Sequence, residues 1–127
     1  MSEARPTDRR RAHERSGRSA ENLAALFLRL KFYRILDRRF KTPVGEIDLV
    51  ARRGKTIAFV EVKRRPSAAL GLEAISPIAQ QRLIRAAEAW LARHPEAMDC
   101  TLRFDALVIV PRRLPLHLEG AFDASRR

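Results

Sequence analysis

Two carboxylates and one lysine carry the strongest chemical signal in the sequence. Asp48 ends the segment Gly-Glu-Ile-Asp, and Glu61 begins Glu-Val-Lys thirteen positions later, which places Lys63 two residues further on. Carboxylate oxygens are preferred Mg²⁺ ligands, and the bound ion polarises a phosphodiester and lowers the pKa of a bound water. A nearby ammonium group orients that water or stabilises developing negative charge. We therefore expect Asp48, Glu61 and the Val62 carbonyl to bind Mg²⁺ or Mn²⁺, and Lys63 to be catalytic.

The elements around these residues predict that they meet. Two apolar β-type runs flank a short polar turn at Gly54, which is a hairpin signal. Folding the chain back at this turn places Asp48 within about one residue of the position opposite Glu61. Opposed side chains on one face have Cβ atoms roughly 5 Å apart, close enough to share a cation. Glu61 and Lys63 share a face because strand side chains alternate.

The same residues have a structural interpretation. Glu61 can form an ordinary ion pair with Lys63, or with an arginine at an exposed strand end, and Glu-x-Lys tripeptides are common. The presence of Asp48 at hairpin distance strengthens the case for a metal site against this alternative.

Charge indicates an anionic partner. The chain holds 26 Lys and Arg residues against 15 acids, a net charge of +11. Nucleic acid is the first expectation and an anionic membrane surface the second, since arginine suits bidentate phosphate contacts. An arginine-rich solvated surface is the alternative, and the acids favour nucleic acid over it. Arg64 and Arg65 follow the site directly, where they are either phosphate contacts or a solvated strand end.

Cysteine and hydropathy patterns bear on the compartment. The single cysteine, Cys100, excludes an intramolecular disulfide and leaves too few thiols for a zinc or iron–sulfur site. This fits a reducing cytoplasm. No apolar run approaches the roughly 20 residues of a membrane span, and no secretory segment follows the N-terminus. We expect a cytoplasmic protein without a membrane partner.

The pattern of elements predicts one α+β domain, residues 19–122, between a disordered basic arm, residues 1–18, and a loose tail, residues 123–127. Helices are expected from Ser19, a good N-cap, and from Ser76-Pro77, a strong helix start that leads to His94. Strands are expected over 33–41, 44–52, 56–64 and 101–110, with a short fifth over 116–118. The order αβββαβ(β) predicts a mixed central sheet flanked by helices.

Several segments resemble a known nuclease superfamily. Gly45 to Asp48 followed by Phe59 to Arg65 resembles the core of the PD-(D/E)XK nucleases, and is most similar to their Holliday-junction-resolvase-like members. More narrowly, the chain resembles the bacterial YraN-type family of small proteins over roughly residues 17–122. Further shared features are Gly17 with Ala20-Glu21, Gly71, Gln81-Arg82, Arg103-Phe104-Asp105 and Ala121-Phe122. The resemblance implies a restriction endonuclease-like fold.

The resemblance also implies roles residue by residue. Asp48 and Glu61 match the metal-binding acids and Lys63 matches the catalytic lysine. Glu21 matches a helix-borne acid that is directed into the same site, although a first-turn glutamate is also favoured there by the helix dipole. Gln80 occupies a catalytic position where the wider family tends to have lysine. Glutamine can hydrogen-bond water or phosphate but carries no charge.

Three functions follow from these observations. The first is a metal-dependent endonuclease that binds and hydrolyses DNA, with branched or structured DNA as the implied substrate and a homodimer implied by analogy. The second is a nucleic-acid-binding module of the same fold that is catalytically silent or depends on a partner protein. The third is a basic adaptor for protein or anionic lipid, in which the acids pair with arginines.

Overall fold

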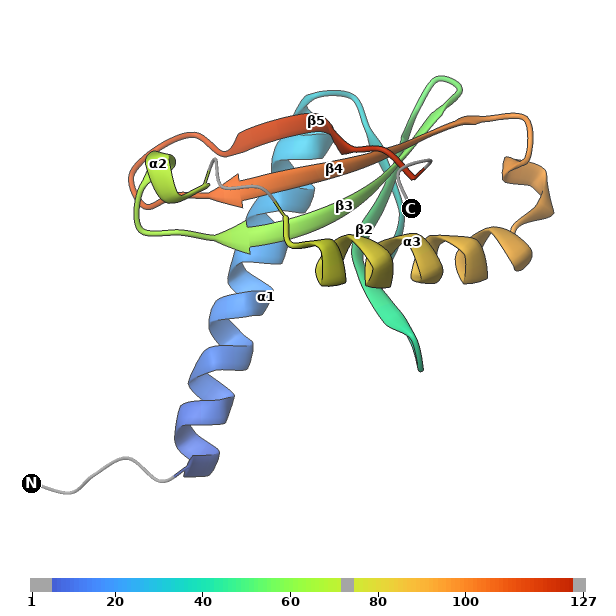
Figure 1. Ribbon diagram of the computed structural model, residues 1–127. Helices are drawn as coiled ribbons and strands as arrows, with labels where there is room; N and C mark the ends of the chain where they lie inside the picture. Colours follow the sequence, from blue (N-terminus) through green and yellow to red (C-terminus); the bar gives the residue numbers. More distant parts are fainter. Residues whose placement is uncertain (1–5, 72–74, 125–127) are drawn as a thin grey trace, which may run out of the picture.

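A mixed five-stranded sheet forms the centre of the computed structural model, which describes residues 6–71 and 75–124 (Figure 1). The strands lie in chain order across the sheet. They are β1 (Arg34–Thr42), β2 (Gly45–Arg53), β3 (Thr56–Arg64), β4 (Thr101–Ile109) and β5 (Leu116–Phe122). All neighbours are antiparallel except β3 and β4, which are parallel. The predicted α+β class and the mixed sheet flanked by helices are confirmed.

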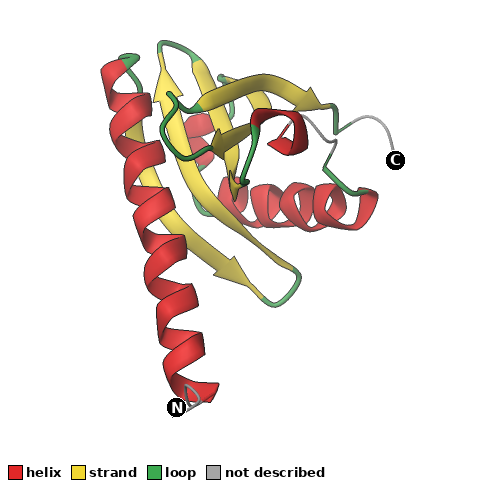
Figure 2. Ribbon diagram, turned by 90° about the vertical axis from the view of Figure 1, so that its left-hand side faces the viewer, coloured by secondary structure: helices red, strands yellow, loops and turns green. Residues whose placement is uncertain are grey.

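Helices cover both faces of the sheet. The long helix α1 (Pro6–Leu30) lies on one side and α3 (Pro77–Ala92) on the other, with the short helices α2 (Ala68–Gly71) and η1 (Pro95–Ala97) before and after α3 (Figure 2). Alternation along β3 explains the two layers. Ala58 and Val60 pack in the core beneath α1, whereas Ile57 and Phe59 pack beneath α3. The α3 segment also makes the crossover that the parallel β3–β4 pair requires.

The predicted start of the first helix at Ser19 is wrong, because α1 begins at Pro6. Residues 6–18, expected as a disordered arm, are helical and extend beyond the sheet (Figure 1). The lack of apolar residues suggested disorder, yet Arg, Ala and Glu are good helix formers and Pro suits the first helical position. Residues 1–5 of that arm and 125–127 of the predicted tail lie outside the described residues. No described helix has both the length and the apolar character to span a membrane.

Other predicted boundaries differ by less. The third strand matches its prediction, and the second begins and ends one residue later than expected. Ser76 caps α3 by accepting from the backbone N–H of Ala79, as its sequence predicts. That helix ends at Ala92 rather than His94. The predicted loop 66–75 contains the single turn α2, and β5 continues to Phe122, whose ring stacks on Phe104 of β4.

The predicted hairpin at Gly54 is confirmed, and its register creates a fork. The β2–β3 ladder runs from Arg53 with Thr56 to Leu49 with Val60, and pairs no further. Beyond that point, residues 45–47 of β2 pair only with β1, and residues 61–64 of β3 pair only with β4. We call this separation of β2 from β3 the fork. In Figure 1 the β1–β2 end diverges from β3 and extends past α3.

A buried polar cluster joins β4 and β5 to the turn after α1. Arg103 donates to both oxygens of the fully buried Asp105, each at 2.8 Å, and forms an ion pair with it. Nε2 of His117 lies 2.7 Å from the same carboxylate, and the Gly120 N–H donates to it at 3.0 Å. Lys31 Nζ lies 2.6 Å from the other His117 nitrogen. Burial alone would raise the pKa of Asp105, but these hydrogen bonds outweigh burial and lower that pKa to about 2.

Candidate functional site

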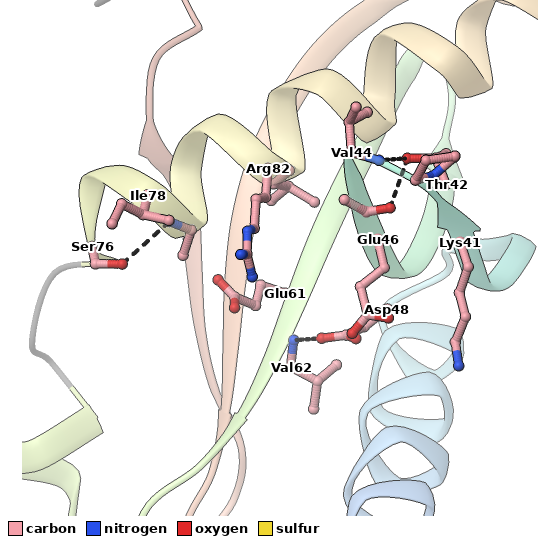
Figure 3. A pocket seen from close by; sticks show the side chains of 14 residues that line it. Lys41, Thr42, Val44, Glu46, Asp48, Glu61, Val62, Ser76, Ile78 and Arg82 are labelled. Atoms are coloured by element: carbon pink, nitrogen blue, oxygen red, sulfur yellow. Dashed lines mark hydrogen bonds between the residues drawn. The ribbon is translucent and has the colours of Figure 1, made fainter.

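Asp48 and Glu61 lie where the fork opens. They are the residues of β2 and β3 that follow the last ladder pair, Leu49 with Val60. Because the ladder ends there, the backbone N–H of Val62 has no carbonyl partner on β2. It donates instead to Oδ2 of Asp48, at 2.8 Å (Figure 3). This hydrogen bond fixes the Asp48 carboxylate against the strand that carries Glu61.

The electrostatic environment disfavours the charge of Asp48. Burial raises the pKa of Asp48 from 3.8 to about 6, although the hydrogen bond from the Val62 N–H opposes the shift. Three neighbouring carboxylates, Glu61, Glu46 and Glu21, raise it further. A carboxyl group that is buried among other carboxylates is stabilised in its ionised form by a cation.

Glu61 is perturbed in the same direction. Burial raises its pKa, and Glu46 adds to the shift, while the positive charges of Lys63 and Arg65 oppose it. Oε2 of Glu61 is buried and accepts no hydrogen bond from any residue that the structure describes. A buried carboxylate oxygen without a partner is costly, and a ligand with positive charge would remove that cost.

These carboxylates fit a hard divalent cation. The donor set is oxygen only, and Glu61 supplies an oxygen with no other partner in the described part of the chain. Within that part, no group of three His, Cys, Asp or Glu side chains comes close enough to hold a metal. An ion at the fork would therefore be held by two carboxylates and would keep several waters, which is the usual coordination of Mg²⁺ in proteins.

An open pocket of about 850 Å³ gives access to both acids. It lies between the β1–β2 end, the first turns of α3 and the end of β3 (Figure 3). Charged side chains on its wall are Lys41, Glu46, Asp48, Glu61 and Arg82. Figure 3 shows the Arg82 side chain extending from α3 toward Glu61. The pocket thus places acids at its base and a cation on the helix above them.

Gly45 explains how α3 is positioned over the site. A Cβ atom at Gly45 would come within 2.1 Å of the backbone carbonyl oxygen of Arg82, closer than atoms can approach. Only glycine allows the β1–β2 end to pack this tightly against α3. The glycine that begins Gly-Glu-Ile-Asp therefore determines how closely the helix approaches the strand that carries Asp48.

Glu21 lines a second pocket with Asp48 but is already paired. Its side chain is 8% exposed, and its two oxygens accept from Nε of Arg38 at 3.2 Å and from Nε of Arg39 at 2.9 Å. This second pocket, of about 370 Å³, lies on the α1 side of the sheet. The structure therefore brings Glu21 near Asp48 while two arginines bind its carboxylate.

Gln80 is not brought to the acids. Its amide nitrogen donates to the carbonyl of Ile75 at 2.8 Å, and Gln80 is absent from the wall of either pocket at the fork. Lys63 is half-buried on the face of Glu61, as alternation predicts, and Arg65 is the next residue on that face. Arg64 points to the other face and lines the α1-side pocket.

Arg82 is the pocket residue that sequence reasoning missed as a site residue. The only sequence signal at Arg82 is the Gln81-Arg82 pair that resembles the family, and Arg82 lies outside the apolar stripe of its helix. Its exposed position opposite the hairpin depends on the packing of α3 on Gly45, which local patterns do not reveal.

Comparison with known proteins gives one consistent family. The model of "Uncharacterised protein family UPF0102" matches residues 20–109. A "UPF0102 protein" of Rhodopseudomonas palustris strain BisB5 is 56% identical over 94% of this chain and 92% of its own length. Proteins of the same description from Nitrobacter winogradskyi and Chelativorans sp. strain BNC1 are 58% and 52% identical, over 87% and 91% of this chain and 93% of their own lengths in both cases.

Proposed function

The chain belongs to the uncharacterised family UPF0102, and we propose from its site that it is a metal-dependent endonuclease that hydrolyses DNA phosphodiesters. The observation that carries the proposal is the meeting of Asp48 and Glu61 at the fork. Both have raised pKa values, and one oxygen of Glu61 has no partner among the described residues. A net charge of +11 supports a polyanionic substrate.

Each side chain at the fork has a defined task in this proposal. Asp48 and Glu61 hold Mg²⁺ or Mn²⁺, with the Val62 carbonyl as a further ligand, and the Val62 N–H keeps Asp48 in place. The bound ion polarises the phosphodiester and acidifies the attacking water. Lys63, on the face of Glu61, orients that water or stabilises the negative charge that develops at phosphorus.

Arginines supply the remaining charge. Arg65 lies on the Glu61 face near the carboxylate, and Arg64 lies on the opposite face of the same strand end. Guanidinium groups bind phosphate oxygens in bidentate geometry, so both are suited to the phosphates beside the reacting one.

The test is a cleavage assay combined with calorimetric titration of Mn²⁺. Labelled four-way-junction, flap, single-stranded and duplex DNA are incubated with wild type, Glu61→Gln and Lys63→Ala. We expect Glu61→Gln to lose both metal binding and cleavage. We expect Lys63→Ala to bind metal but to cut DNA at least about 100-fold more slowly than wild type. Glu96→Gln and Lys55→Ala, at exposed positions away from the fork, are the matched controls. Cleavage that survives in Glu61→Gln contradicts the proposal.

A silent or partner-dependent DNA-binding module is the second candidate. It is favoured by the positions of Gln80, which bonds to the Ile75 carbonyl, and of Glu21, which two arginines bind. Two of the expected catalytic groups are thus engaged elsewhere. Wild-type protein that binds Mn²⁺ and DNA without cutting any of the four substrates would select this function.

A further inference from the structure

Two pockets meet at the fork, one on each face of the sheet. The larger is walled by α3 and the smaller by α1, and these helices cover opposite faces of the sheet. Four residues line both pockets, namely Lys41, Glu46, Asp48 and Val62. The metal-binding acid proposed above therefore lies between the two pockets and lines both the one on the α3 side of the sheet and the one on the α1 side.

Cations stand on both sides of this acid. Arg82 faces the α3-side pocket, Arg18 and Arg64 face the α1-side pocket, and Lys41 lines both. No described carboxylate pairs with Lys41, Arg64 or Arg82. Cationic side chains on both sides of an acidic centre, without an acidic partner in the described part of the chain, are available to bind phosphates of a nucleic acid backbone.

The residues that line the two pockets also bear on whether nucleic acid bases are recognised at the fork. No aromatic residue is among the described residues that line either pocket. These described walls therefore offer no stacking platform, and their charged side chains are suited to the backbone of a nucleic acid. A backbone contact carries no direct sequence information, so we expect weak sequence preference.

We propose that the substrate strand is unpaired at the fork and bends around it, from the α3 side of the sheet to the α1 side. Arg82 holds a phosphate on one side of the reacting group, and Arg64 holds a phosphate on the other. Duplex DNA is stiff, with a persistence length of about 150 base pairs, and does not turn from one face of a sheet to the other within a few nucleotides. This inference rests on the proposed nuclease function and names its substrate class.

The test measures binding in EDTA, where metal-dependent cutting cannot occur. Fluorescence anisotropy gives the affinity of the full chain for a labelled single strand, and for the same strand in a duplex, at several salt concentrations. We expect the single strand to bind more tightly than the duplex at the same salt, because only the flexible strand can reach the cations on both faces, with little change between sequences. Equal or tighter binding of duplex overturns the proposal.

Arginine variants then test the path. Each lost phosphate contact reduces the slope of log K against log salt by about 0.7 on a single strand. We expect Arg82→Ala and Arg64→Ala each to reduce the slope by that amount, and the double variant to reduce it by the sum. The matched controls are Arg85→Ala on α3 and Arg34→Ala at the start of β1, both exposed and outside the pockets. If only one of the two site variants lowers the slope, the strand stays on one face and the proposal is wrong.

The two proposals fail separately. Loss of all cleavage in the metal assay, with the binding pattern intact, removes the nuclease but keeps the strand path. The opposite result is also possible. Cleavage could depend on Glu61 while the duplex binds more tightly than the single strand in EDTA and one arginine variant leaves the salt slope unchanged. That result keeps the nuclease proposal and rejects the proposal of an unpaired substrate.

Discussion

Gly45 and Arg82 are in backbone contact across the site, and a methyl group on Gly45 would lie within 2.1 Å of the Arg82 carbonyl oxygen. The contact joins the β1–β2 end to α3, so it links the element that carries Asp48 to the helix that closes the pocket above it. The helix and the strand end therefore have to move together.

Replacing Gly45 by alanine should separate these elements. The new methyl group meets backbone rather than a flexible side chain, so α3 must shift, at a cost of about 1–3 kcal/mol in the free energy of unfolding. Urea denaturation measures this loss. Gly17→Ala is the matched control, since nothing lies within 4 Å of its added Cβ, and it should keep or raise stability in helix α1. Wild-type stability in Gly45→Ala would contradict the packing described here.

Metal affinity should depend on the ionisation of Asp48. A carboxyl group must be deprotonated to bind a divalent ion, and the pKa of Asp48 is raised to about 6. Affinity for Mn²⁺ should therefore increase from pH 5 to pH 7 and level off above pH 7. Calorimetric titration across this range checks the midpoint. A pH-independent affinity would show that Asp48 is not a ligand.

Removing the charge of Asp48 should stabilise the metal-free protein. The pKa of Asp48 is higher in the folded chain than its ordinary value of 3.8, so the ionised carboxylate opposes folding above pH 6, and this penalty disappears as the pH falls toward 4. Asp48→Asn keeps an oxygen that can accept from the Val62 N–H. In EDTA at pH 8, Asp48→Asn should melt above wild type, and the difference should shrink at pH 4.5. A lower melting temperature at pH 8 contradicts this account.

Asp105 should behave in the opposite sense. Its folded pKa is lowered to about 2, so its carboxylate stabilises the fold above about pH 4, and this contribution is lost as the pH falls toward 2. Asp105→Asn leaves Arg103 and His117 without their buried partner, and we expect a loss of about 3–5 kcal/mol at pH 7. Urea unfolding at pH 7 and pH 2 measures both effects. Asp99→Asn, at an exposed position, is the control and should change the free energy of unfolding little. A small loss of stability in Asp105→Asn at pH 7 would contradict the role given to the buried cluster.

Glu21 should contribute little to metal affinity. Its two oxygens accept hydrogen bonds from Arg38 and Arg39, and these two positive charges compete with an ion at the fork for the carboxylate. Glu21→Gln should bind Mn²⁺ within about threefold of wild type, whereas Glu61→Gln should not bind it. Calorimetric titration of both variants under one condition makes the comparison. A Glu21→Gln variant that loses metal binding would assign this residue a direct role.

Local features of the chain were predictable from sequence. The turn at Gly54, with a φ of 61°, and the alternation along β3 are determined by residues close in sequence, so the placement of Asp48 and Glu61 next to the last pair of the β2–β3 ladder followed directly. Ser76-Pro77 likewise marked the start of α3 through contacts within one turn.

Features that depend on packing between distant elements were not predictable. The arginines that bind Glu21 come from β1, and Arg39 adopts a φ of 52°, an unusual conformation that no periodic pattern indicates. The approach of Arg82 to the acids depends on how α3 packs against Gly45, 37 positions earlier in the chain. The resemblance implied a catalytic role for Gln80. Its side-chain amide instead donates to the carbonyl of Ile75, just before the start of its own helix.

The hydrogen bond from Val62 to Asp48 makes one amide proton a reporter of the site. Its acceptor is a carboxylate whose pKa is about 6, whereas neighbouring strand amides donate to backbone carbonyls, which do not titrate. The nuclear magnetic resonance signal of the Val62 amide should therefore shift with pH around 6, and again when a divalent ion binds. The charge state at the fork can thus be followed in solution without any substrate.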